Sequence, residues 1–266
     1  MISEDLEESV SWEDTLDTIS FELRDAGVID GFALPLAAYM YAAYLNRCPL
    51  IMIGPNSNAI IDAFSGAIFG RTVGTLECSD KYSAGSIRKC FSSSDKIIKI
   101  TNPFSNEWVN RIPEIITKNS EKYFFVVHPY SEDLLIEPKS LYSYMLPIFT
   151  DLLIEKAPAG QITGGKQMNN YKEFQIVNRT NIHGKILTEM HAPLLVRSNI
   201  QTLLSNMHAM LNDKNIDYDV LFALFPYAYA TMQMPLLLDA INNEKKTLSV
   251  SKYLRDTIIG MYSGNE

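Results

Sequence analysis

The stretch from Cys48 to Gly70, CPLIMIGPNSNAIIDAFSGAIFG, decides the fold. It opens with an apolar run, residues 49–53, which ends at Gly54, and a short polar turn follows. Apolar side chains then recur at helical spacing, at Ile60, Ile61, Phe64, Ala67 and Ile68. The stretch therefore predicts a buried strand, a tight turn and a helix, which is the outline of a phosphate-binding loop.

On either side of this stretch, short apolar runs alternate with helical patterns. We expect strands at Leu50–Ile53, Val73–Glu77, Lys96–Thr101, Tyr123–His128 and Phe174–Val177. We expect helices at Ala59–Phe69, Ala84–Ser92, Asn106–Lys118 and Leu141–Glu155. Such alternation is typical of βαβ units, and continuous apolar runs are typical of strands buried on both faces. The sequence therefore predicts an α/β fold with a parallel sheet covered by helices.

The two ends of the chain have different patterns from the middle. Residues 1–30 form an acidic arm that we expect to be helical, because Trp12, Leu16, Ile19 and Leu23 recur at helical spacing. An apolar helix, residues 31–45, then leads into the first strand. From about Thr180 only helical patterns follow. We therefore expect three parts: the arm (1–30), an α/β core (31–179) and a helical lid subdomain (180–266).

The loop at Gly54 lacks the residues that would hold a phosphate. A working phosphate loop reads G-x-x-x-x-G-K-[ST], in which the lysine neutralises the phosphates and the hydroxyl holds magnesium. On this template Ala59 replaces the second glycine, Ile60 the lysine and Ile61 the hydroxyl residue. An alkyl side chain cannot pair with a phosphate, and burying that charge without a cation is expensive. The loop between the two glycine positions consists of Pro55, Asn56, Ser57 and Asn58.

The helix of residues 31–45, the Gly54 loop and the following VGTLEC strand together resemble the entry to an AAA+ domain of the P-loop NTPase superfamily. The resemblance covers residues 31 to about 260, and it implies a P-loop-like sheet followed by a helical lid. It also implies an acidic Walker B pair at the end of the third strand, where this chain has Thr101 and Asn102. Without a carboxylate there, magnesium loses an anchor and the attacking water loses its base. The family's polar sensor falls on His128.

These losses together predict a domain that kept an AAA+ fold and gave up hydrolysis. We expect a pseudo-ATPase, not an enzyme, without a cofactor or metal ion. The resemblance implies a structural or regulatory scaffold whose partners are proteins, such as active AAA+ subunits or a fused effector. One alternative is a regulatory domain that binds ATP or GTP without hydrolysis, with residues 56–58 contacting the phosphates. Another is a nucleic-acid adaptor that uses a patch around Lys166, Lys172 and Arg179.

Charge argues against nucleic acid as the main partner. The net charge is −8, and no basic run exceeds two residues, whereas affinity for phosphate backbones comes from clustered Lys and Arg. A second glycine-rich stretch, residues 160–166, matches G-x-x-x-x-G-K but is not followed by a helical pattern. We expect it to be a loop or a hairpin tip.

Neither a membrane segment nor a metal site is expected. The uncharged stretch Val220–Leu238 contains Pro226 and Pro235 and has no flanking basic anchor, so we interpret it as buried helices broken near the prolines. The acidic N-terminal residues lack the pattern of a signal peptide, which predicts a cytoplasmic location. The four histidines and three cysteines have no metal-ligand spacing, and we expect them to be structural or exposed.

Overall fold

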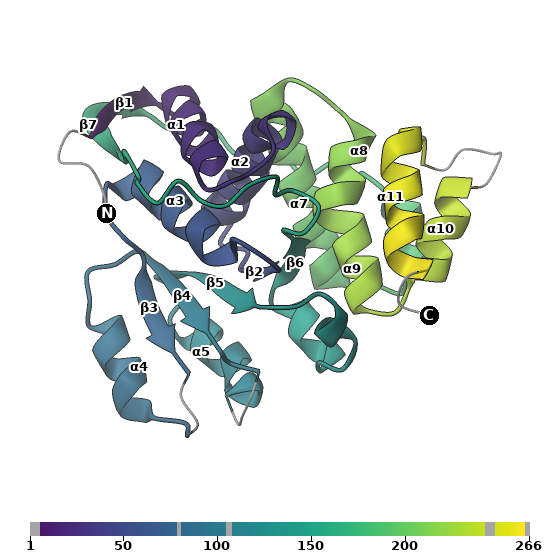
Figure 1. Cartoon of the computed structure of the whole chain (residues 1–266), viewed down its shortest axis with the longest axis horizontal. Coiled ribbons are helices and arrows are strands. Elements are labelled where there is room, and N and C mark those ends of the chain that lie inside the picture. The colour runs from purple at the N-terminus through teal and green to yellow at the C-terminus, as the bar shows by residue number, and fades with distance from the viewer. Residues whose placement is uncertain (1–5, 79–80, 105–107, 243–247, 264–266) are drawn as a thin grey trace.

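A five-stranded parallel sheet forms the centre of the molecule (Figure 1). The computed structural model describes residues 6–78, 81–104, 108–242 and 248–263. The strand order is β3-β4-β5-β2-β6, and every neighbouring pair is parallel. The expected α/β fold with a parallel sheet covered by helices is confirmed. The strands are β2 (Leu50–Ile53), β3 (Gly74–Glu77), β4 (Ile97–Thr101), β5 (Tyr123–His128) and β6 (Leu146–Phe149).

The register of β2 places three strand ends side by side. Its last residue, Ile53, stands opposite His128 of β5 and Phe149 of β6. All four residues of β2 are buried, as expected for a strand covered on both faces. The loop that begins at Gly54 therefore lies at the carboxyl edge of the sheet, between the ends of β5 and β6.

Helices cover this sheet and extend beyond it. Those in the first half of the chain are α1 (Trp12–Asp25), α2 (Asp30–Leu45), α3 (Ser57–Phe69), α4 (Ala84–Phe91) and α5 (Ile112–Lys118). Those in the second half are α6 (Gly184–Glu189), α7 (Leu194–Leu211), α8 (Ile216–Asp219), α9 (Phe225–Ala230), α10 (Met234–Asn242) and α11 (Lys252–Ser263). In Figure 1 the second group gathers beside β6, where α9 contacts the strand and α7 contacts α2.

The acidic arm is not entirely helical, contrary to expectation. Its first described residues form β1 (Glu7–Ser11), which pairs in parallel with β7 (Gly165–Lys172). Helix α1 begins directly after β1, because Ser11 and Asp14 form a capping box in which each side chain accepts from the other's backbone N–H. The expected apolar stripe of Leu16, Ile19 and Leu23 is buried.

The expected strand Phe174–Val177 is wrong, since these residues form no strand. Instead, individual residues of this segment make separate contacts with other parts of the chain. Phe174 packs edge-on against Trp12, with ring centroids 5.1 Å apart. The Val177 backbone N–H donates to Asn206 Oδ1 of α7 at 3.0 Å. The strand lies earlier, at β7, where mostly polar side chains suit an exposed two-stranded sheet.

The expected helix Leu141–Glu155 is also wrong. A short 3₁₀ helix, Lys139–Ser143, is followed by strand β6. Pro147 stands inside β6, where it would break an α-helix but is tolerated because β6 is an edge strand. Helix Asn106–Lys118 is partly confirmed as a 3₁₀ turn, Val109–Arg111, and α5, while residues 106 and 107 of that expectation lie outside the described residues.

The apolar stretch Val220–Leu238 is broken near Pro235, as expected, but it is not broken at Pro226. A π-helical turn, Val220–Leu224, runs into α9, and residues 231–233 separate α9 from α10. Pro226 lies inside the continuous helical stretch 216–230, directly after the π-helical turn that replaces regular α-helical bonding there. Within the described part of the chain, none of the helices has the length and apolar character that crossing a membrane requires.

Candidate functional site

The loop after β2 is shorter than the phosphate-loop template requires. Helix α3 begins at Ser57, two residues before the expected start, and Asn56 caps it in the left-handed conformation with φ of 59°. Ser57 and Asn58 therefore belong to the first turn of the helix. Ile60 and Ile61 are fully buried in the hydrophobic core, so the positions of the lysine and the hydroxyl residue face away from any ligand at the loop.

A carboxylate of the chain itself lies against this loop. Gly54 has φ of 104°, and a Cβ atom added there would lie 2.5 Å from Asp151 Oδ2. Asp151 follows β6, and partial burial raises the pKa of its carboxyl group. The first glycine of the loop therefore lies directly against a group that carries negative charge when ionised.

Hydrogen bonds tie the loop to the end of β6. The Thr150 backbone N–H donates to Ile53 O at 2.7 Å, and the Thr150 hydroxyl lies 2.6 Å from Pro55 O and 2.9 Å from Ile53 O. The Ser57 hydroxyl donates to Gly54 O at 2.8 Å. The Ser57 side chain, which was a possible phosphate contact, is thus bonded inside the loop.

Asn56 closes the other side of the loop. Its Nδ2 donates to Ala26 O at 3.0 Å and to Lys156 O at 2.9 Å. Two segments far apart in sequence, the end of α1 and the chain after β6, are joined through one amide. The Asn56 side chain is therefore part of the scaffold rather than a free phosphate ligand.

The other two AAA+ landmarks lie at the same edge of the sheet. Thr101 ends β4, and its carbonyl accepts from the Cys78 N–H at 3.0 Å. Asn102 follows with φ of 56° and is exposed. His128 ends β5, and its carbonyl accepts the Gly54 N–H at 3.0 Å. Its ring instead contacts Phe104 and lies 3.8 Å from Glu137 Oε1, and burial lowers the pKa of His128.

The second glycine-rich stretch also binds a carboxylate of the chain. The backbone N–H groups of Thr163 and Gly164 donate to Glu22 Oε1 at 2.8 and 2.9 Å. Glu22 is only 1% exposed, and burial raises its pKa. This stretch is a loop, as expected, but it leads into the parallel strand β7 rather than into a hairpin.

The basic residues considered for nucleic acid have acidic or polar neighbours. Lys166 stands opposite Glu8 in the β1–β7 pair, and Lys172 Nζ lies 3.7 Å from Glu13 Oε1. The Arg179 guanidinium donates to the Ser198 hydroxyl at 2.7 Å. The two lysines therefore lie along an acidic strand.

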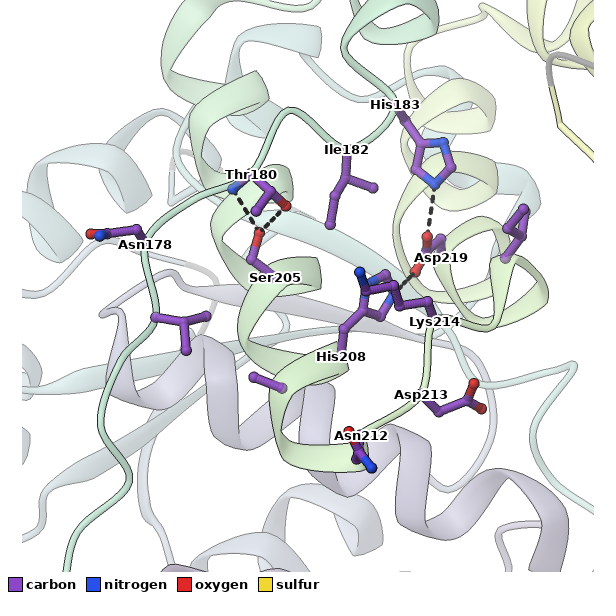
Figure 2. Close-up of a pocket in the computed structure, with 13 residues that line it drawn as sticks. Asn178, Thr180, Ile182, His183, Ser205, His208, Asn212, Asp213, Lys214 and Asp219 are labelled. Atoms are coloured by element: carbon purple, nitrogen blue, oxygen red, sulfur yellow. Dashed lines mark hydrogen bonds and ion pairs between the residues drawn. The ribbon is translucent and has the colours of Figure 1, made fainter.

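A cavity of about 770 Å³ opens among the C-terminal helices, where the sequence indicated no site (Figure 2). It is bounded by the segment 177–183, by α7 and by residues 212–219. We call it the histidine pocket, and it is lined by Val177, Asn178, Thr180, Ile182, His183, Ser205, His208, Ala209, Asn212, Asp213, Lys214, Ile216 and Asp219.

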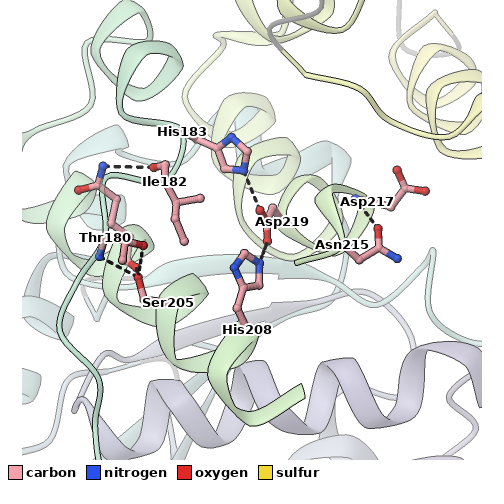
Figure 3. Close-up of polar contacts among 9 residues, drawn as sticks. Thr180, Ile182, His183, Ser205, His208, Asn215, Asp217 and Asp219 are labelled. Carbon is pink, nitrogen blue, oxygen red and sulfur yellow. Dashed lines mark hydrogen bonds and ion pairs between the residues drawn. The ribbon is translucent and has the colours of Figure 1, made fainter. Parts of the chain in front are cut away.

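Two histidines share one buried carboxylate in this pocket (Figure 3). His183 Nε2 donates to Asp219 Oδ2 at 2.7 Å, and His208 Nε2 donates to Asp219 Oδ1 at 2.6 Å. Asp219 is only 2% exposed. These side chains come from the start of α6, from α7 and from the end of α8, so no spacing in the sequence could have revealed the cluster.

The cluster is not a serine nucleophile with its base. The Ser205 hydroxyl donates to Gln201 O at 2.7 Å and accepts from the Thr180 N–H at 3.0 Å. Its proton is therefore directed to the α7 backbone rather than to a histidine. Among the residues that the structure describes, no group of three or more His, Cys, Asp or Glu side chains could hold a metal ion.

Comparisons with known proteins leave the family open. No protein-family model matches the chain, and neither a curated protein nor a solved structure matches it. The likeness to AAA+ domains therefore rests on the residues and on the parallel sheet described above.

Proposed function

We propose that this chain is a catalytically inactive AAA+-like domain, a pseudo-ATPase that acts as a structural or regulatory scaffold in a larger protein assembly. The observation that carries the proposal is the Asp151 carboxylate against Gly54. It supports the proposal because Gly54 is the first glycine of the phosphate-loop template, and a carboxylate beside that loop would repel a phosphate.

Repulsion between the Asp151 carboxylate and the phosphates would oppose the binding of a nucleotide at this loop. Two like unit charges about 4 Å apart repel by roughly 4 kcal/mol at the effective dielectric constant near a protein surface. A phosphate loop overcomes the charge of its ligand with a lysine and a magnesium ion. Here the lysine position is Ile60, buried in the core, and the Walker B position is Thr101.

Exposed apolar residues on the C-terminal helices support protein partners. Helix α7 begins with Leu194 and Leu195, whose exposed fractions are 72% and 59%. Contiguous exposed apolar surface is typical of protein contact sites, and these two leucines supply such surface at one helix end. The acidic arm and this end of α7 are where we expect partner contacts, including contacts with active AAA+ subunits or a fused effector.

ATP and GTP hydrolysis assays combined with a thermal-shift panel test the proposal. The panel uses ATP, ADP, GTP and GDP, each with and without magnesium. A ligand present at a hundredfold excess over its Kd stabilises the native state by about 2.7 kcal/mol. We expect no hydrolysis of ATP or GTP. We also expect no nucleotide to raise the melting temperature by binding at the Gly54 loop.

Gly54→Val is the matched control for the loop. A branched side chain at this positive-φ position would collide with Asp151 and strain the backbone, which would abolish any residual binding at the loop. Its melting temperature without ligand, compared with that of the wild type, shows whether the variant is folded. A shift that is present in the wild type and lost in Gly54→Val would contradict the closed loop and favour the non-hydrolysing nucleotide binder. Magnesium-dependent turnover would contradict the pseudo-ATPase itself.

A further inference from the structure

The two rings of the histidine pocket expose the same atom. Because each Nε2 is bonded to Asp219, the nitrogen left over on each ring is Nδ1. Within the described residues, neither Nδ1 has a hydrogen-bond partner, and neither is among the buried unpaired atoms. Asp219 thus fixes the orientation of His183 and His208 and leaves both Nδ1 atoms available to a ligand.

The buried Asp219 carboxylate is satisfied by hydrogen bonds from the two histidine rings. Burying a carboxylate is costly unless a cation compensates it, and the short bonds of 2.6 and 2.7 Å are typical of charge-assisted pairs. The two imidazole N–H groups satisfy both oxygens of this carboxylate, so Asp219 needs no further partner from a ligand.

Further donors line the same cavity. The Lys214 ammonium group and the side-chain amides of Asn178 and Asn212 have no hydrogen-bond or ion-pair partner among the described residues. All three residues line the cavity, although in Figure 2 the Asn178 side chain points away from the histidine cluster. Several unpaired donors around one cavity are suited to an oxyanion, and Lys is a common phosphate-binding residue.

The cavity also has an apolar part. Val177, Ile182, Ala209 and Ile216 line it, and its volume of about 770 Å³ is far larger than a bare phosphate needs. Pockets that hold small organic ligands usually have volumes of roughly 300–1,000 Å³. Asp213, which is exposed and also unpaired among the described residues, is the one lining carboxylate outside the histidine cluster and would repel an anion.

We propose that the histidine pocket binds a small organic phosphate monoester. The phosphate lies in the cavity beside the two rings and meets the Lys214 ammonium group, and the organic group lies against Ile182 and Ile216. Asp219 is a positioning residue, because it acts through the two rings. The inference is independent of the proposed function, since no residue of the pocket belongs to the Gly54 loop.

Ring signals in NMR spectra test the site directly. Phenyl phosphate is titrated into the full chain at constant ionic strength, with inorganic phosphate and sodium chloride as separate titrations. The chain has only four histidines, so each ring can be assigned by substitution. We expect saturable shifts at His183 and His208 but not at His128 or His191, and tighter binding of phenyl phosphate than of inorganic phosphate.

Three exposed residues provide variants that leave the fold intact. Lys214→Gln should weaken phenyl phosphate binding about threefold to tenfold, and Asp213→Asn should strengthen it. Lys185→Gln is the matched control, because Lys185 is an exposed lysine outside the pocket lining, and it should change nothing. No saturable shift, or equal affinities for Lys214→Gln and the wild type, would overturn the site. Equal binding of inorganic and phenyl phosphate would overturn the ester assignment.

The variants also separate this site from the Gly54 loop. A nucleotide that shifts the melting temperature of the wild type and of Gly54→Val, but not of Lys214→Gln, binds in the histidine pocket. That result would support the inference and leave the proposed function standing. A shift lost only in Gly54→Val would contradict the proposed function alone.

Discussion

The Gly54 loop and the histidine pocket both contain a carboxylate, but the two carboxylates are placed in opposite ways. Asp151 lies directly against Gly54, the first glycine of the loop. Asp219 lies behind two imidazole rings and leaves their outer nitrogens accessible. Asp151 therefore opposes ligand binding at the Gly54 loop, which the sequence motif predicts. Asp219 instead orients the two rings of the histidine pocket, which no sequence motif predicts.

The comparison shows that a motif and a site are different things. A loop outline comes from a few consecutive residues, whereas the state of the site depends on groups brought from elsewhere. The second glycine-rich stretch makes the same point, because its backbone donors at Thr163 and Gly164 bind Glu22 of α1 rather than an external anion. In both glycine-rich stretches the nearest anion belongs to the chain.

The largest effect is expected for Asp219→Ala. This substitution leaves two imidazole N–H groups without their buried acceptor, and breaking a buried ionic cluster costs about 3–5 kcal/mol. Urea unfolding should show this loss. Asp213→Ala is the control, because Asp213 is exposed and lines the same cavity, and its effect should be small. Equal effects of the two substitutions would mean that the histidine cluster does not stabilise the pocket.

Asn56 should be the most sensitive position of the Gly54 loop. Asn56→Ala removes two hydrogen bonds and leaves a residue that disfavours positive φ, for a combined loss of about 2–3 kcal/mol. Asn56→Gly removes the same bonds without that backbone strain, so it should be less destabilising by about 1 kcal/mol. Chemical denaturation separates the two variants, and identical midpoints would contradict the strained conformation.

Glu22 should make stability depend on pH. Burial raises the pKa of Glu22 above its usual 4.5 in the folded protein, so the folded state holds the proton more readily than the unfolded state. Its contribution to stability is full below pH 4.5 and is lost as pH rises through the folded pKa. Glu22→Gln cannot titrate, so its stability relative to the wild type should rise across that window. Parallel pH profiles of the two proteins would contradict the raised pKa.

The smallest effect is expected for Asp151→Asn. Asp151 is largely exposed and its carboxyl group is only partly shielded from water, so the free energy of unfolding should change by no more than about 0.5 kcal/mol. Because partial burial raises the pKa of Asp151, the change should be a gain at neutral pH. The variant should still bind no nucleotide at the loop, since Ile60 provides no cation. Calorimetric titration with ADP checks this, and tight binding would show that Asp151 alone keeps the loop closed.

The strands of the parallel sheet were predictable where a short run of consecutive apolar residues marks them. Strands β2 and β5 begin and end at the predicted residues, because each is an uninterrupted apolar run. Strand β6 was missed, because Leu146–Phe149 lies within a longer stretch whose apolar residues also fit a helix. What makes it a strand is pairing with β2 and contact with α9, and neither partner is close in sequence.

The candidate sites were predictable only in part, for the same reason. The missing lysine and the missing Walker B carboxylate could be read directly from the sequence. The closure of the loop could not, because Thr150 and Ile53 are 97 residues apart. Nor could the histidine cluster, since His183 and Asp219 are 36 residues apart and meet only when α6 and α8 are packed.

The backbone amide signals of Gly54 and Ser57 give the most direct test of the closed loop. ADP is titrated into the full chain, with and without magnesium, while these two amides are followed by NMR. The account predicts no saturable shift at either amide, whatever happens at the histidine pocket. A saturable shift at both amides, lost in Asn56→Ala, would contradict it and show that the loop still holds phosphate.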